Sequence, residues 1–127
     1  MNAKILVVDD MPAMRSIVSG MLDELGFTNV LQAEDAEIAW RLIQSSGEKD
    51  PFKLVIADWN MPGMSGVDLL RSVRSSPQFR TLPFLMVTAK NQQANIAEAQ
   101  RAGVSAYMVK PFSSIELQER ISDIFGS

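Results

Sequence analysis

The chain has 127 residues, with 12 basic side chains against 15 acidic ones and a formal net charge of −3. It has no cysteine and no histidine, which excludes disulfides, thiolate metal sites, cysteine nucleophiles and histidine-based catalytic triads. The acidic balance argues against direct binding to nucleic acid or to anionic membranes. Because no stretch is apolar enough for a signal peptide or a membrane span, we expect a soluble, cytoplasmic globular protein.

Short apolar runs alternate with helical patterns along the whole chain. The runs predict strands at 5–8, 28–33, 54–57, 84–87 and 105–109. The periodic segments predict five helices. The first runs from Pro12 to just before Gly26, the second follows a cap at Asp35, and the third lies around 69–73. The fourth ends at about Ala102, and the fifth follows a capping box at 113–116. Strands that are apolar throughout are typical of parallel sheets buried on both faces. The sequence therefore predicts an α/β fold with a doubly wound, five-stranded parallel sheet and five helices.

Polar side chains come directly after four of the five predicted strands: Asp9 and Asp10, Asp58, Thr88, and Lys110. Each alone is an ordinary turn or cap residue. In an open α/β sheet, however, sites form beyond the carboxyl ends of the strands, so we expect these side chains to meet at one edge.

The three acids at this edge constrain the chemistry. Two carboxylates ~5 Å apart repel each other by about 3 kcal/mol at an effective dielectric of about 20, so a cluster needs a cation or a raised pKa. Oxygen ligands without histidine or cysteine favour Mg²⁺ over softer metals. A carboxylate can also accept a phosphoryl group, and a lysine beside it can pair with the resulting anion.

These residues lie in segments that resemble response-regulator receiver domains. The segments are VVDD (7–10), DWNMPGMSG (58–66), LPFLMVTA (82–89) and AGVSAYMVKPF (102–112). With LGFTNVLQAEDA (25–36), they are most similar to the single-domain chemotaxis regulators of that family. The resemblance covers essentially the whole chain and implies one receiver domain over residues 1–127. It also implies the flavodoxin-like strand order 2-1-3-4-5 and a cis bond between Lys110 and Pro111.

The resemblance implies a role for each acid of the site. Asp58 would accept a phosphoryl group from a phosphohistidine on a sensor histidine kinase of the chemotaxis type. Asp10 and Asp58 would ligate Mg²⁺ directly, whereas Asp9 would act through water and Asn60 through its backbone carbonyl. Lys110 would pair with the phosphoryl oxygens.

The resemblance further implies a conformational switch. Thr88 would move to hydrogen-bond the phosphoryl group, and Tyr107 would swing inward behind it. The output face would consist of the fourth helix, the fifth strand and the fifth helix, with exposed residues Lys90, Ile96, Tyr107, Val109 and Arg120. The implied target is the flagellar motor switch or another phosphorylation-dependent partner, and the chain would act as a monomer that turns over no external substrate.

The chain departs from the chemotaxis pattern on this face. Lys90 stands where a glutamate is common, Gln92 and Gln93 replace basic residues, and Asp123 replaces a lysine. We expect these changes to affect the choice of partner and not the phosphoacceptor chemistry.

Four alternatives remain open at the level of sequence. One is the receiver part of a larger regulator, or a receiver with a non-flagellar target. A second is a Mg²⁺-dependent phosphatase with Asp58 as nucleophile, which would need an acid where Asn60 stands. A third is a flavin-binding protein, although residues 9–12 offer acids and a proline where a phosphate loop needs N–H donors. The fourth is a receiver-like protein that is never phosphorylated.

Overall fold

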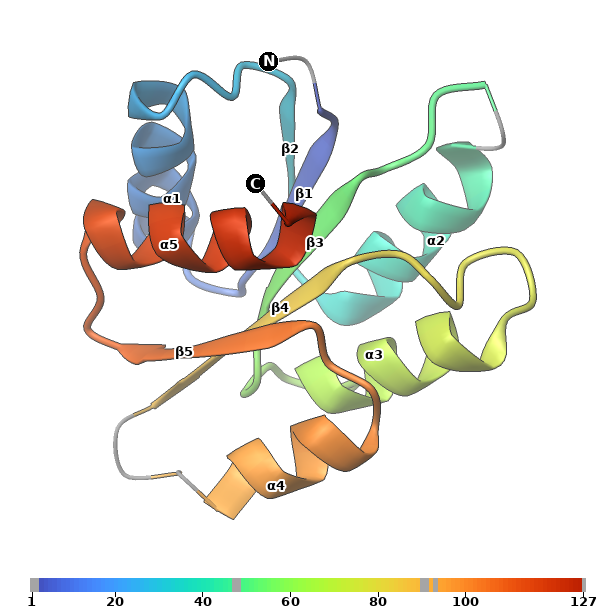
Figure 1. The fold of residues 1–127 in the computed structure, drawn as a ribbon. Helices are drawn as coiled ribbons and strands as arrows, with labels where there is room; N and C mark the ends of the chain where they lie inside the picture. The colour runs from blue at the N-terminus through green and yellow to red at the C-terminus, as the bar shows by residue number, and fades with distance from the viewer. Residues whose placement is uncertain (1–2, 47–48, 90–91, 93, 127) are drawn as a thin grey trace.

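The protein forms a parallel sheet of five strands covered by helices on both faces (Figure 1). The structure, a computed structural model, describes residues 3–46, 49–89, 92 and 94–126. The strands are β1 (Ile5–Val8), β2 (Val30–Ala33), β3 (Leu54–Asp58), β4 (Phe84–Ala89) and β5 (Ala106–Lys110). The helices are α1 (Pro12–Glu24), α2 (Ala36–Ser46), α3 (Gly66–Ser75), α4 (Ala94–Arg101) and α5 (Ser114–Phe125). The strand order β2-β1-β3-β4-β5 confirms the predicted fold.

The sheet separates two hydrophobic cores. Figure 1 shows α1 and α5 on one face of the sheet and α2, α3 and α4 on the other. Successive strand residues point to opposite faces, so Ile5 and Val7 of β1 pack with α1 and α5, whereas Leu6 and Val8 pack with α2 and α3. Every residue of β1 and of β3 is buried, as the apolar runs predict. None of the described helices is long and apolar enough to cross a bilayer.

The ends of several elements differ from the prediction. Strand β2 starts at Val30 and not at Thr28, whereas β4 continues through Thr88 to Ala89 and β5 continues through Lys110. The last two strands are longer because they pair with each other, Thr88 with Val109 and Ala89 with Lys110. Thr88 and Lys110 are thus held by the sheet itself, which apolar patterning did not indicate.

Helix capping agrees with the prediction at the start of α5, but the start of α3 carries a capping box that was not predicted. At the predicted capping box before α5, the Ser113 side chain accepts a hydrogen bond from the Glu116 N–H. A reciprocal capping box that the sequence analysis did not predict starts α3, between Ser65 and Asp68. The bond between Lys110 and Pro111 is cis, as the resemblance implied.

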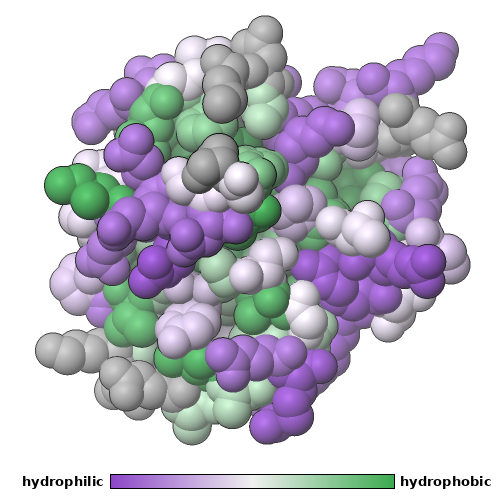
Figure 2. Space-filling view, in the orientation of Figure 1, coloured by the Kyte–Doolittle hydropathy of each residue, from purple (hydrophilic) through white to green (hydrophobic). Residues whose placement is uncertain are grey.

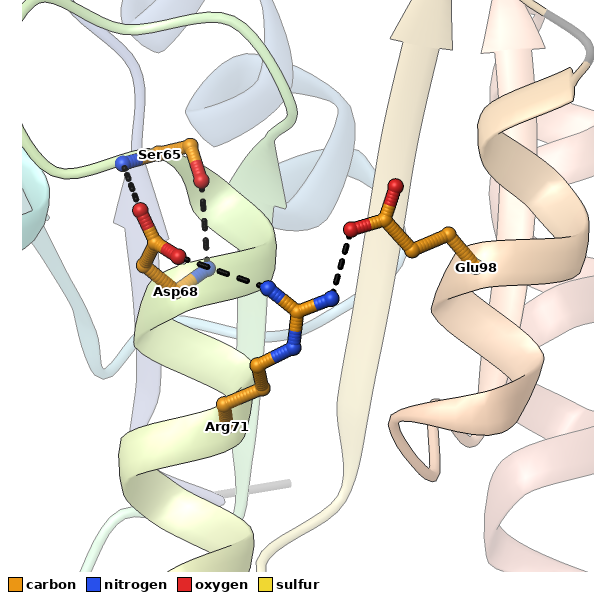
Figure 3. A network of polar contacts seen from close by, with 4 residues as sticks. All are labelled: Ser65, Asp68, Arg71 and Glu98. Carbon is orange, nitrogen blue, oxygen red and sulfur yellow. Dashed lines mark hydrogen bonds and ion pairs between the residues drawn. The ribbon is translucent and has the colours of Figure 1, made fainter.

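One polar network joins α3 to α4 (Figure 3). The Arg71 guanidinium lies 3.5 Å from Asp68 Oδ1 and 2.5 Å from Glu98 Oε2 on α4. Asp68 in turn accepts a hydrogen bond from the backbone N–H of Ser65 at the start of α3. A chain of side chains therefore runs from the loop after β3 to the middle of α4.

Candidate functional site

Three carboxylates meet at the carboxyl edge of the sheet. Asp9 and Asp10 follow β1, and Asp58 is the last residue of the neighbouring strand β3. One carboxylate oxygen from each lies within 4.8 Å of the others. Asp9 is 3% exposed and Asp58 is 9% exposed, whereas Asp10 is exposed to solvent. The prediction that these acids converge is confirmed.

Lys110 supplies the positive charge of the cluster. Its Nζ lies 3.3 Å from Asp58 Oδ1 and 3.5 Å from Asp9 Oδ2. It reaches both acids from the last position of β5, which is separated from β3 by β4. In this structure the ammonium therefore bridges the two buried carboxylates.

Asp9 anchors the loop between β1 and α1. Its Oδ1 accepts a hydrogen bond of 2.9 Å from the Met11 N–H, and its backbone carbonyl accepts one of 2.6 Å from Arg15 Nη1. Both carboxylate oxygens of Asp9 thus have a partner, Met11 for one and Lys110 for the other. This leaves the exposed Asp10, together with Asp58, as the acids more available to a metal ion.

The environment of Asp58 disfavours its ionised form. Burial raises the pKa of the Asp58 carboxyl above its ordinary value. The Lys110 ammonium opposes this rise, and the charges of Asp9 and then of Asp10 add to it. The ionised carboxylate is therefore short of positive charge, and a cation at the cluster would relieve it.

A raised pKa in the folded state makes stability depend on pH. The stabilising contribution of protonated Asp58 is fully present below the pKa of the unfolded chain, and it is lost as pH rises through the higher folded pKa. In EDTA, we therefore expect Asp58→Asn to be more stable than the wild-type protein at pH 7, by a margin that grows as the pH rises above about 3.9, the ordinary pKa of an aspartate. Urea unfolding of both proteins at four pH values measures this margin. A constant margin would contradict the assigned shift.

Thr88 adds an unused hydrogen-bonding group beside these charges. Its side chain is 1% exposed, and Oγ1 has no hydrogen-bond partner among the described residues. The preceding residue, Val87, lies opposite Asp58 in the sheet and accepts a hydrogen bond from the Trp59 N–H. An unpaired buried hydroxyl costs about 1–3 kcal/mol, so such groups are rare unless a partner arrives from outside. Thr88 thus suits an anion held at Asp58.

The residues present fit a hard divalent cation. The donors are carboxylate oxygens alone, two of them buried, with the exposed Asp10 open to solvent. Mg²⁺ is commonly held by one or two carboxylates and keeps water or phosphate oxygens as its other ligands. The raised pKa of Asp58 and the unpaired Thr88 hydroxyl together favour a site that takes both a cation and an anion.

Asn60 and Gln92 form a contact that the sequence did not predict. The Asn60 side chain donates a hydrogen bond of 2.7 Å to Gln92 Oε1, in the segment between β4 and α4. From the sequence, Gln92 is expected to affect only the choice of partner. In the structure it contacts Asn60, which the sequence analysis assigns to the metal site. This contact joins residues 32 positions apart, which sequence spacing did not reveal.

The predicted output face is less exposed than expected. Four of its residues are half-buried, which corrects the expectation that they are exposed: Ile96, Tyr107, Val109 and Arg120. The reason is that α5 packs against β5 and α4 packs against the neighbouring strand β4. Tyr107 packs against the core beneath α4, and Arg120 Nε donates a hydrogen bond to the Tyr107 carbonyl. The fifth predicted residue, Lys90, lies outside the described residues.

The surface of this face is mixed in character. Figure 2 shows hydrophobic patches that hydrophilic side chains separate from one another. Ile115 and Phe125 on α5 are 68% and 42% exposed, and the sequence analysis did not single them out as surface residues. Asp123 forms an ion pair of 3.8 Å with Arg120, so the chain itself partly offsets its charge.

Gly66 is a site residue that the sequence analysis did not identify. Its N–H donates to the Trp59 carbonyl, and it places the start of α3 directly against the end of β3. A β carbon at this position would lie 2.2 Å from the Asp58 carbonyl oxygen. Gly66 stood at the end of the loop predicted before the third helix, where a glycine is ordinary, so its place in the sequence did not mark it.

Comparisons with known proteins agree with this geometry. A family model described as response regulator receiver domain matches residues 5–122. The chemotaxis protein CheY of Pseudomonas aeruginosa is 47% identical over 122 residues, which cover 96% of this chain and 95% of that protein.

Two solved structures are similar over almost their whole length. The chemotaxis protein CheY4 of Vibrio cholerae has a TM-score of 0.85 and 31% identity, over 98% of this chain and 99% of that one. The receiver domain of a Pseudomonas aeruginosa sensor histidine kinase has a TM-score of 0.84 and 27% identity, over 100% of both chains. That domain was solved with a magnesium ion coordinated in its active site cleft.

Proposed function

The chain belongs to the response regulator receiver domain family, the phosphoacceptors of two-component systems, and on that premise we propose that Asp58 accepts a phosphoryl group from a histidine kinase. One observation carries this assignment. Asp58 is a buried acid that clusters with Asp9 and Asp10 and lies 3.3 Å from Lys110 Nζ, and the neighbouring strand β4 carries the Thr88 hydroxyl, which has no partner among the described residues. The arrangement is suited to an anion that is covalently held at Asp58.

The proposed reaction is a direct transfer. A carboxylate oxygen of Asp58 forms a bond to the phosphorus of a phosphohistidine as the bond from phosphorus to the imidazole nitrogen breaks. The imidazole keeps the electron pair of that bond. Lys110, 3.3 Å from Asp58, stabilises the negative charge on the phosphoryl oxygens. The chain catalyses its own phosphorylation and dephosphorylation and turns over no external substrate.

We assign the cofactor Mg²⁺ to Asp10 and Asp58 directly, with Asp9 acting through water and Asn60 through its backbone carbonyl. The oxygen-only donors within 4.8 Å support this assignment, as does the magnesium ion in the related receiver domain. When bound, Mg²⁺ supplies positive charge to the carboxylates and to the phosphoryl oxygens.

Trp59 provides a reporter for this metal site. It is 8% exposed and adjacent to Asp58, so Mg²⁺ should quench its fluorescence saturably over a background from Trp40. Asp10→Ala removes a direct ligand, and we expect it to weaken the affinity about tenfold or more, equivalent to about 1.4 kcal/mol. Glu24→Ala, at the far end of α1, is the control and should titrate like the wild-type protein. An unchanged titration of Asp10→Ala would place the metal elsewhere.

We propose that phosphorylation acts on the face formed by α4, β5 and α5. Thr88 would donate a hydrogen bond to the new dianion, and Tyr107 would move inward behind it. The half-buried position of Tyr107 between the core and the surface supports this proposal.

The sequence identity to chemotaxis proteins favours the flagellar motor switch as the target and the cytoplasm as the location. A non-flagellar target, or a place within a larger regulator, is the second candidate.

The target can be tested with a peptide from the N-terminus of a motor-switch protein. A partner that prefers the active state by ~2.7 kcal/mol binds it about a hundredfold more tightly. We therefore expect beryllofluoride with Mg²⁺ to raise the affinity of this protein for the peptide by about that factor, measured by fluorescence anisotropy. Equal affinities with and without beryllofluoride would contradict the switch. Weak binding in both states would point to a different target.

A further inference from the structure

The side chain of Gln92 connects the loop after Asp58 to the segment that precedes α4. Gln92 Oε1 accepts a hydrogen bond of 2.7 Å from Asn60 Nδ2 and one of 3.1 Å from Asn95 Nδ2. The backbone of Gln92 is itself fixed, because its N–H donates to the Ala89 carbonyl and its carbonyl accepts from the Asn95 N–H, both at 3.0 Å. Gln92 therefore links Asn60 to the residue after which β4 ends, Ala89, and to Asn95 of α4.

The hydrogen bond to Gln92 restrains the side chain of Asn60. The preceding residue, Trp59, is fixed through both backbone groups, its N–H to the Val87 carbonyl and its carbonyl to the Gly66 N–H. Asn60 is the first residue beyond this fixed point, and it is exposed. Among the described residues, the hydrogen bond recorded for its side chain is the one to Gln92.

The chemistry of this contact depends on an acceptor at position 92. A glutamine oxygen accepts the two amide donors, whereas a lysine side chain has no acceptor. Glutamate at this position would keep the acceptor, and methionine would keep the length of the side chain without a nitrogen or oxygen atom.

We propose that Gln92 is a positioning residue that fixes Asn60 relative to Asp58 and thereby strengthens Mg²⁺ binding. The inference rests on the proposed function, in which the Asn60 carbonyl is a metal ligand. A loop that is already ordered does not lose conformational freedom when the metal binds, so its affinity is higher. Gln92 acts from the segment that leads into α4, and so it also couples metal binding to the start of this helix.

The test is a set of Mg²⁺ titrations followed by Trp59 fluorescence, with calorimetry in parallel. We expect Gln92→Met to lower the affinity about two- to tenfold, the range for loss of one hydrogen bond. Gln92→Glu keeps the acceptor and should bind Mg²⁺ at least as tightly as the wild-type protein. Asn95→Ala removes the second donor alone and is the matched control, with an affinity within about twofold of wild type.

A double-mutant cycle with Asn60→Ala decides whether Gln92 acts through Asn60. In that background the contact is already lost, so adding Gln92→Met should cause no further loss of affinity. Urea unfolding midpoints show whether the variants are folded.

The inference is overturned by a wild-type affinity of Gln92→Met, or by an equal loss in the Asn60→Ala background. A flat titration of the wild-type protein, in fluorescence and calorimetry, would instead overturn the Mg²⁺ site and this inference with it.

Discussion

Asp58→Asn is expected to reduce incorporation of phosphoryl label from acetyl phosphate to background. The asparagine keeps the size and the position of the side chain at the end of β3, but it lacks the anionic oxygen that attacks phosphorus. The fold should be retained, because removing a buried charge that is short of counter-charge does not destabilise the protein. Incorporation of ³²P, with the site mapped by mass spectrometry, measures the effect.

Asp123→Asn is the control for this experiment. Asp123 is an acid with a 71% exposed side chain on α5, and its substitution should leave labelling at the wild-type level. Label on Asp58→Asn at the wild-type rate would show that another residue accepts the phosphoryl group. The neighbouring acids Asp9 and Asp10 would then be the first candidates.

Gly66→Ala is expected to have the largest effect on stability. The added β carbon would lie 2.2 Å from the Asp58 carbonyl oxygen, 3.0 Å from its carbonyl carbon and 3.1 Å from Met86 Sδ. The first two are backbone atoms of β3, which cannot move without disturbing the sheet. Overpacking of this kind costs about 3 kcal/mol, a large part of the stability of a small domain. Urea unfolding should show this loss.

The same substitution should also weaken Mg²⁺ binding, because any relief of the clash displaces Asp58. Gly20→Ala is the matched control. Gly20 lies within α1, and a β carbon there would meet nothing within 4 Å, so this change should stabilise the protein by up to about 1 kcal/mol through helix propensity. Wild-type stability of Gly66→Ala would contradict the close approach of α3 to β3.

The positions of the acids could be predicted because the relevant signals are local. An apolar run that stops at an acid defines both a strand and its end, as at Val8 and Asp9. Parallel strands present their carboxyl ends at the same edge, so the order of elements alone brings Asp9, Asp10 and Asp58 together. The strand order that makes β1 and β3 neighbours, the individual roles and the cis bond before Pro111 came instead from the resemblance to a family.

The contacts between loops could not be predicted in the same way. The Asn60–Gln92 hydrogen bond joins residues whose separation depends on how two loops pack, and no periodicity encodes that distance. The half-burial of Ile96, Val109 and Arg120 has a similar origin, since it follows from how closely α5 approaches β5 and α4 approaches β4. A pattern of residue types indicates which face a side chain takes, but not how much of it a neighbouring helix covers.

The sequence by itself determined the fold, the edge of the sheet that carries the site, and the acids, hydroxyl and lysine that make it up. These follow from apolar residues that repeat every two residues in strands and every 3.6 residues in helices, and from the topology of parallel strands. The tertiary structure alone decided that Asp9 and Asp58 are buried and Asp10 is exposed, that Lys110 bridges Asp9 and Asp58, and that the Thr88 hydroxyl has no partner among the described residues. Burial, charge pairing and hydrogen bonding are set by distances of a few ångströms between segments far apart in the chain, and only packing fixes these distances.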